Sequence, residues 1–395
     1  MVLDRSAPPS PGSTAALRSA NQQRIVTVIR RWPGDAEDAA EPLTQATLAR
    51  LTGLAPATVS NIVRDLVAED LVETEPGSGR RGTVVRLSPR AGLVAGIDFG
   101  HSHVSVALGD LAGGLRSESR RRLDHDHPIE EGLGLAATML ADLVAANGER
   151  SPLRSIGLGV PAPITDDVVR SAAILPGWVG VNARRAAGAH FGVPVHVEND
   201  ANLGALAEQR LGAARGHRDA VFVKVSSGVG GGLILGDRMF RGSAGTAGEI
   251  GHLTLDEQGP VCRCGSRGCL EAYASTATIQ QLLADQLPDA SIDDIVAAAR
   301  EGHVSALRAL EDAGLHLGWA AASVVNLLDP GLVVVGGDMA RAGDLLLDSV
   351  RVGLRRHALD TAATTEVVAG QLDERASLVG AVLLAADTVD LAAPS

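Results

Sequence analysis

The sequence predicts an α/β protein in which a small N-terminal unit precedes two α/β lobes with a cleft between them. The first 90 residues show the patterns of helices, turns and a hairpin, whereas strands alternate with helices from Leu93 onward. Two stretches of the body, one from Leu93 and one from Asp219, each begin with a strand and a glycine-containing turn, which indicates two similar lobes. With 395 residues, 45% of them hydrophobic, the chain is long enough for two or three domains.

Composition excludes several classes of protein. Only 2% of the residues are aromatic, which argues against a stacking platform for single-stranded nucleic acid. Neither a run of about 18 apolar residues nor a signal-peptide pattern is present, so we expect a cytoplasmic protein with no membrane partner. The formal net charge of −12 divides into +1 for residues 1–90 (11 Arg, 10 Asp and Glu) and −13 for the remainder, which predicts two different surfaces.

The first 90 residues carry the features of a DNA-binding unit. We expect residues 1–16, rich in Pro, Ser and Gly, to be a disordered tail, and residues 17–90 to form a folded domain. Thr44 is suited to cap a short helix, and Pro56 to begin the next helix after a tight turn at Gly53. Two helices joined by so short a turn and followed by a hairpin are typical of a winged helix-turn-helix.

The helix from Pro56 has two contrasting faces. Its apolar stripe consists of Val59, Ile62, Val63, Leu66 and Val67. Its opposite face would offer small and polar side chains to the major groove of DNA: Thr58, Ser60, Asn61 and Arg64. Arg80 and Arg81 lie at the hairpin tip, where they would reach the minor groove. A near-neutral module gathers few phosphate contacts, so we expect a homodimer or homotetramer on DNA; the alternative is a packing module that touches no DNA.

Residues 91–395 are predicted to form the two-lobed body. Strands are expected at 93–99, 104–108, 155–160 and 332–335, a helix at 129–147, and another helix that ends at 328. A glycine-rich turn is expected from Gly228 to Gly232, between two strands of the second lobe.

The sharpest chemical signal is a group of metal-binding residue types. All three cysteines of the chain, Cys262, Cys264 and Cys269, lie within eight positions, and His252 precedes them. Three thiolates and one imidazole complete a tetrahedral zinc shell, and four protein ligands close it, so we expect a structural Zn²⁺ in a module spanning 252–271. The alternative is three unrelated buried cysteines; an odd number in a cytoplasmic chain disfavours disulfides.

Four motifs follow one another along the body. They are Gly96-Ile97-Asp98-Phe99-Gly100, Glu198-Asn199-Asp200-Ala201-Asn202, Gly248-Glu249-Ile250-Gly251-His252 and a Cys-x-Cys-Gly-x-x-Gly-Cys-x-Glu run that ends at Glu271. In this order they resemble the ROK family (repressors, open reading frames, kinases) in its regulator form. The resemblance runs from about Leu17 to the C-terminus. It implies a winged helix-turn-helix followed by a two-lobed, actin-like (ribonuclease H-like) ATPase or sugar kinase fold.

The resemblance implies a sugar site between the lobes. In ROK kinases the residue that matches Asp200 is the general base that takes a proton from the sugar, and Asn199, Glu249, His252 and Glu271 match residues that hold sugar hydroxyls. Carboxylates and amides suit a polyol because each accepts or shares two hydrogen bonds. His252 would use one ring nitrogen for zinc and the other for the sugar. The alternative is that Asp200 caps a helix while both glutamates are solvated.

The loops that would bind a nucleotide depart from the family pattern. The first resembles Asp-x-Gly-Gly-Thr-Lys, but His101 replaces its second glycine, and the second loop has Ser226 in place of its leading glycine. The positions that match nucleotide contacts are Asp98, on the magnesium side, and Gly100, Ser102, Ser227, Gly228, Gly230, Gly336 and Gly337. A side chain where backbone must approach a phosphate hinders binding, so we expect weak or absent binding of ATP and Mg²⁺.

Together these features predict a DNA-binding transcriptional regulator of carbohydrate metabolism, and a repressor in the first place. Its expected partners are double-stranded operator DNA, a sugar or sugar derivative in the kinase-like cleft, and further copies of the chain. The alternative is an ATP-dependent hexose kinase, similar to a glucokinase, with a DNA-binding extension; Asp98 and Asp200 favour it, whereas His101 and Ser226 weigh against it. A structural assembly protein would leave the polar cluster at Asp200 without a purpose.

Overall fold

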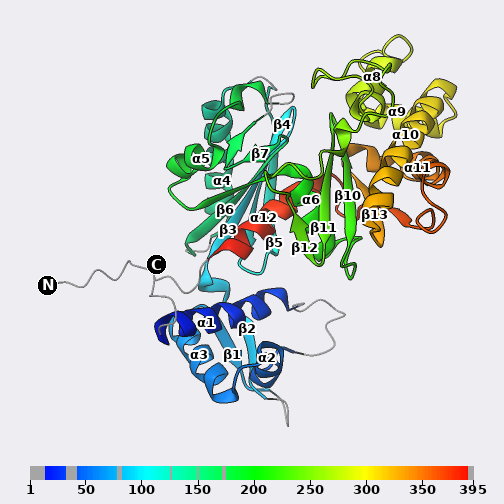
Figure 1. Ribbon diagram of the computed structural model, residues 1–395. Coiled ribbons are helices and arrows are strands. Elements are labelled where there is room, and N and C mark those ends of the chain that lie inside the picture. The colour runs from blue at the N-terminus through cyan, green and yellow to red at the C-terminus, as the bar shows by residue number, and fades with distance from the viewer. Residues whose placement is uncertain are drawn as a thin grey trace.

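The computed structural model describes residues 14–32, 42–77, 82–124, 127–148, 151–170 and 175–389. Two α/β lobes stand side by side above a small N-terminal unit (Figure 1). Residues 1–13 of the expected tail, and Arg80 and Arg81 at the hairpin tip, lie outside the described residues. Across these described ranges no helix has the length and apolar character needed to cross a membrane.

The N-terminal unit is a winged helix-turn-helix, as the sequence predicts. It consists of α1 (Thr14–Arg31), α2 (Gln45–Thr52), α3 (Pro56–Ala68) and an antiparallel hairpin of β1 (Val72–Glu75) and β2 (Val84–Leu87). Helix α1 begins at Thr14, so residues 14–16, which were expected in the tail, are helical. The Thr44 hydroxyl accepts a hydrogen bond from the Thr47 amide (3.1 Å) and caps α2, and Gly53 turns the chain with a φ of 67°.

Helix α3 buries the predicted apolar stripe except at its edge. Val59, Ile62, Val63 and Leu66 are buried, but Val67 is 38% exposed. At about 100° per residue Val67 lies roughly 80° around the helix from Val59, so it falls at the edge of the stripe.

The first lobe has a five-stranded sheet in the order β5-β4-β3-β6-β9. Its strands are β3 (Leu93–Phe99), β4 (His103–Asp110), β5 (Leu115–Arg122), β6 (Leu153–Val160) and β9 (Val195–Asn199). Helices α4 (Ile129–Asn147) and α5 (Ala183–Phe191) cover its outer face, and a short hairpin is formed by β7 (Ile164–Thr165) and β8 (Val168–Val169) (Figure 1).

The second lobe repeats this topology, as the sequence predicts. Its sheet has the order β12-β11-β10-β13-β14, again with three antiparallel strands followed by two parallel ones. The strands are β10 (Ala220–Val225), β11 (Val229–Leu235), β12 (Arg238–Phe240), β13 (Leu332–Gly336) and β14 (Glu366–Ala369). Its helices are α7 (Glu271–Ala274), α8 (Thr276–Leu283), α9 (Ile292–Arg300), α10 (Val304–Leu328) and α11 (Asp344–His357).

The glycine run of the second lobe differs from the prediction. Only Ser226–Gly228 forms the turn, whereas Gly230–Gly232 belong to β11. These glycines are required by close packing: a Cβ on Gly232 would lie 2.6 Å from the Ala201 carbonyl oxygen, and one on Gly231 would lie 2.8 Å from that of Gly248. The glycines that predicted a turn are therefore needed for the close approach of β11 to its neighbours.

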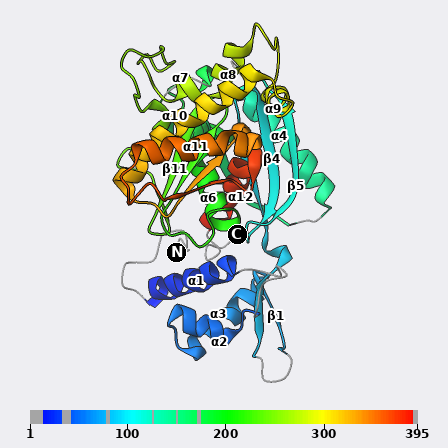
Figure 2. The same cartoon turned by 90° about the vertical axis from the view of Figure 1, so that its right-hand side faces the viewer.

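Helix α12 (Ala376–Thr388) joins all three parts of the molecule. It lies between the lobes beside α6 (Asp200–Leu211), and Figure 2 shows it above α1. Its Val382, Ala385 and Ala386 share one apolar cluster with Ile25 and Ile29 of α1. Just beyond its end, the Val389 carbonyl oxygen accepts a hydrogen bond from Arg30 Nη2 (2.9 Å). The N-terminal unit and the body therefore share a continuous core.

Candidate functional site

The cleft between the lobes contains a cavity of about 420 Å³, within the usual range of ligand pockets. It is lined by nearly all the residues predicted for a sugar or nucleotide: Asp98, Gly100, Ser102, Asn199, Asp200, Ser227, Gly228, Gly230, Glu249, His252, Glu271 and Gly337. Gly336 is not in the lining, because it lies against the Phe222 ring at the end of β13. Motifs that are far apart in the sequence thus meet in one place.

Asp200 begins α6 and forms an ion pair with Lys224 of β10. Lys224 Nζ donates to Asp200 Oδ2 (2.7 Å) and to Ser377 Oγ (2.9 Å), and Ser377 Oγ donates to the Asp200 carbonyl oxygen (2.9 Å). Burial alone would lower the pKa of Lys224, but the Asp200 and Asp98 carboxylates raise it above its ordinary value. Sequence reasoning missed Lys224 and Ser377; the one signal was that the chain has no other lysine.

Asp98 lies one residue before the end of β3 and is the least exposed charged residue of the cavity lining. The residue is 4% exposed, and its Oδ1 has no hydrogen-bond partner among the described residues. Burial raises the pKa of Asp98 to about 6, although Lys224 opposes this.

Asn199, not Asp200, caps α6. Its Oδ1 accepts hydrogen bonds from the amides of Ala201 (2.9 Å) and Asn202 (3.2 Å), and its Nδ2 donates to the Ala162 carbonyl oxygen (3.3 Å). The alternative in which Asp200 is the cap is therefore wrong. The cap orders the helix terminus and leaves the Asp200 carboxylate facing the cavity.

Glu249 and Glu271 approach Asp200 from the second lobe. Glu271 is 6% exposed; its Oε2 accepts from the Val229 amide (3.0 Å) and its Oε1 from Arg263 Nε (2.8 Å), so it is not solvated. Burial, followed by the charges of Asp200 and Glu271, raises the pKa of Glu249 to about 7. These carboxylates present several acceptors to one cavity, the arrangement that a polyhydroxylated ligand requires.

The predicted zinc ligands come together beside this cavity. The ligand atoms of His252, Cys262, Cys264 and Cys269 all lie within 4.8 Å of one another. Cys264 Sγ and Cys269 Sγ are 3.8 Å apart, as are Cys262 Sγ and His252 Nδ1. Ligands at 2.3 Å from a tetrahedral ion would be about 3.8 Å apart, so the residues fit Zn²⁺, and the sulfur spacing is far from that of a disulfide.

His252 lies between the cysteine cluster and the cavity. Its Nδ1 faces the cysteine cluster, and its Nε2 lies 4.0 Å from Glu249 Oε2. The cluster loop also requires Gly268, with φ of 63°, since any side chain there would collide with the Asp256 backbone. One ring nitrogen thus faces the cluster and the other the cavity side.

On the nucleotide side of the cleft, a histidine covers the first glycine-containing loop. The His103 ring packs over Gly100, so even a Cβ at that glycine would collide with it. His103 Nδ1 lies 3.4 Å from Arg120 Nη2, and burial together with the Arg120 charge lowers the pKa of His103 to about 4. A neutral imidazole stands where the family pattern has a lysine.

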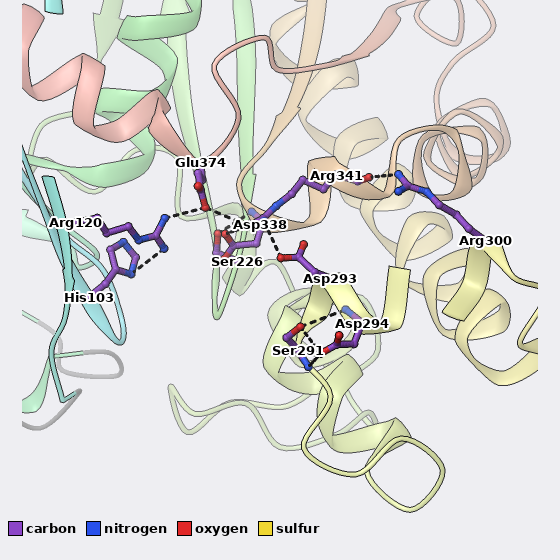
Figure 3. Close-up of polar contacts among 10 residues, drawn as sticks. All are labelled: His103, Arg120, Ser226, Ser291, Asp293, Asp294, Arg300, Asp338, Arg341 and Glu374. Carbon is purple, nitrogen blue, oxygen red and sulfur yellow. Dashed lines mark hydrogen bonds and ion pairs between the residues drawn. The ribbon is translucent and has the colours of Figure 1, made fainter. Parts of the chain in front are cut away.

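An ion-pair network crosses from this point to the second lobe (Figure 3). Arg120 Nη1 contacts Glu374 Oε2 (2.8 Å), and the same oxygen contacts Arg341 Nη2 (3.2 Å). Arg341 also pairs with Asp293 (2.9 Å) and Asp338 (3.2 Å). Charged groups on this side of the cleft therefore pair with one another across the two lobes.

The predicted DNA-contacting face of α3 is on the surface. Ser60, Asn61 and Arg64 are exposed and Thr58 is half-buried, opposite the buried stripe. These side chains are free of the core and available to a groove.

Comparison with known proteins adds two family matches. Residues 94–388 match the model of the ROK family, and residues 36–81 match that of the MarR family. The chain is 31% identical over 319 residues to the xylose repressor of Bacillus spizizenii, covering 78% of this chain and 82% of the relative.

Two solved structures represent the two kinds of relative, a regulator and a kinase. A ROK family transcriptional regulator, described as a homolog of the Escherichia coli Mlc protein, superposes with a TM-score of 0.79 and 25% identity, covering 95% of this chain and 97% of its own. A ROK family glucokinase from Streptomyces griseus, in complex with glucose and AMPPNP, gives 0.66 and 29% identity, and covers 99% of its own chain but only 74% of this one.

Proposed function

This chain belongs to the ROK family, and on that premise we propose that it is a sugar-responsive repressor. Its N-terminal unit binds operator DNA, and a sugar or sugar derivative in the cleft controls that binding. The similarity to repressors over most of the chain supports this, and so does the set of acceptors in the cavity. Since such a protein acts on chromosomal DNA, the cytoplasmic placement expected from the sequence follows from the function.

Helix α12 is the single observation that carries the proposal. Ser377, in its first turn, bonds to Asp200 and Lys224 in the cleft, and its other end shares a core with α1. A ligand that changes the angle between the lobes therefore displaces an element on which the DNA-binding unit rests. For repression, the sugar must bind the DNA-free arrangement more tightly than the DNA-bound one.

Zn²⁺ is proposed as the structural ion of the Cys₃His cluster. The ligand distances and the absence of an open position in a four-ligand set support a structural ion. When bound, the ion would fix the loop that carries His252 at the cavity.

We also propose that the repressor is a homodimer or homotetramer. A winged helix reads one half-site, and two half-sites about 34 Å apart, one helical turn of DNA, require two copies. Sedimentation equilibrium of the full chain tests this, and a monomer at every concentration would contradict it.

The hexose kinase remains the alternative because the glucokinase matches the whole body, and Asp98 and Asp200 are retained. A coupled assay for ADP with a panel of hexoses distinguishes the two. Turnover that is lost in Asp200→Asn would establish the kinase.

The repressor itself is tested by fluorescence anisotropy on the DNA upstream of its gene. We expect tight binding relative to random DNA at physiological salt, and release by one member of a monosaccharide panel. Equal affinity for both DNAs under every condition would overturn the proposal.

A further inference from the structure

We propose that Lys224 is a resident cation of the cleft, which takes the place beside Asp98 and Asp200 that a divalent metal ion with its nucleotide would need. It fixes Asp200 as an acceptor for a ligand hydroxyl. Lys224 is thus a positioning residue of the sugar site, and in this respect the inference rests on the proposed function.

Lys224 connects three elements of the protein: β10, α6 and α12. Its side chain leaves β10 in the second lobe, is 18% exposed, and reaches Asp200 Oδ2 (2.7 Å) and Ser377 Oγ (2.9 Å). Asp200 begins α6, and Ser377 lies in the first turn of α12. Such a short contact between largely buried groups is a charge-assisted hydrogen bond, stronger than a contact between neutral groups.

Charge balance supports the replacement of a metal ion. Asp98 and Asp200 together supply two negative charges, which a divalent ion would match in the absence of other charges. Lys224 already supplies one positive charge, and Arg120 also acts on Asp98. A divalent ion added to the same carboxylates would face this buried ammonium, and such repulsion is strong where water is excluded.

The same contact restricts what Asp200 can do. A general base must take up a proton, but Oδ2 is already occupied by the ammonium group. Oδ1 remains as an acceptor, so Asp200 can hold a sugar hydroxyl without a phosphoryl donor being present. Lys224 also bonds to Ser377 of α12, so this one side chain connects a ligand bound at Asp200 with α12.

The first test is a rescue by metal in the full chain. Lys224→Met removes the ion-pair partner of Asp200 and one positive charge near Asp98, so we expect MgCl₂ to raise the Tm of this variant but not that of the wild type. Arg218→Met is the matched control, since it breaks an exposed pair with Asp237 and should not respond to Mg²⁺. A variant that ignores Mg²⁺, or a wild type stabilised as strongly, would overturn the proposal.

The second test needs no substitution at position 224. Because the chain has a single lysine, selective ¹⁵Nζ labelling gives one side-chain NMR signal. We expect this signal to persist and to keep its position when MgCl₂ and AMPPNP are added to the wild type, and to shift in Asp200→Asn. Displacement of the wild-type signal by Mg²⁺–AMPPNP would contradict the resident cation.

The third test measures, by calorimetry, the affinity of the wild type and of Lys224→Met for D-xylose, D-glucose and N-acetyl-D-glucosamine. We expect any sugar that binds the wild type to do so without Mg²⁺, and at least about tenfold more weakly to Lys224→Met, the range for loss of a charge-assisted bond. Undiminished binding to this variant would contradict the positioning role. If none of the sugars binds the wild type, the proposed function loses its support, while the Mg²⁺ and NMR results still decide the role of Lys224.

Discussion

The Asp98 carboxyl shows how burial creates a pH dependence. Its pKa is about 6, compared with 3.8 for the ordinary group, so the folded state holds the proton more tightly than the unfolded chain does. The stability from this group is present below about pH 4 and is lost as the pH rises through 6; in total this is about 3 kcal/mol.

Asp98→Asn should therefore flatten the free energy of unfolding between pH 4 and 6. Urea unfolding across this range measures the slope for the wild type and the variant, with the exposed Asp237→Asn as a control that keeps the wild-type slope. Equal slopes for Asp98→Asn and the wild type would show that Asp98 is ionised with an ordinary pKa.

The Cys₃His cluster predicts a defined metal content. Purified protein should contain about one Zn²⁺ per chain, and both Cys269→Ser and His252→Ala should lower this, because each removes one of four ligands. His217→Ala, a histidine outside the cluster, should retain the metal. Atomic absorption gives the stoichiometry, and zinc-free wild-type protein that folds normally would refute the assignment.

At the residue scale, sequence reasoning found the groups that lie in motifs and missed those that do not. Asp98, Asp200, Glu249 and Glu271 each belong to a short pattern, and all four line the cavity. Lys224 lies outside every predicted site pattern, and Ser377 is 153 residues further along the chain. A partner fixed only by the tertiary fold leaves no local spacing to read.

Among the described elements, α3 carries the side chains predicted to read bases in the major groove. Asn61→Ala should weaken operator binding by about 1–3 kcal/mol, roughly 5- to 150-fold, with little effect on random DNA, if its amide bonds to base edges in the major groove. Arg308→Ala, on the exposed side of α10, is the control. Fluorescence anisotropy measures the affinity for both DNAs. An equal loss of affinity for operator and random DNA would show that Asn61 contacts the DNA phosphates and not the bases.

If α12 connects the cleft with the N-terminal unit, a substitution at their contact should weaken the effect of the sugar on DNA binding and leave both binding sites intact. Arg30→Met removes the bond to Val389, so the sugar should lose part of its effect on DNA affinity while its own affinity stays the same. Arg18→Met is a control on the same helix, since Arg18 pairs with Asp65 inside the N-terminal unit. If the sugar changes the DNA affinity of both variants by the same factor, α12 does not connect the two sites.

Element bounds were predictable where the pattern was long. The strand 93–99 and the helix 129–147 have the bounds that the sequence predicts, because each is a sustained apolar pattern. Gly230–Gly232 were misassigned, since glycine marks both a turn and a strand pressed against a helix, and only the packing of Ala201 distinguishes the two.

On the scale of the whole molecule, the two lobes have the same strand order, and the N-terminal winged helix-turn-helix shares an apolar core with the body. Strand β5 of the first lobe is tied to the segment before α12 by Arg120–Glu374 and Glu118–Arg375. The duplication was predictable from the repeated strand–turn pattern. The placement of α1 against α12 was not, because residues 25 and 385 meet only in the folded chain.

The central claim, that a sugar in the cleft and operator DNA compete through one structure, is tested most directly by reciprocity. Once an effector is found, calorimetry should measure its affinity for the free protein and for the protein saturated with operator. We predict that operator weakens sugar binding by the same factor by which the sugar weakens operator binding, as linkage requires. Sugar affinity unchanged by operator would contradict the account.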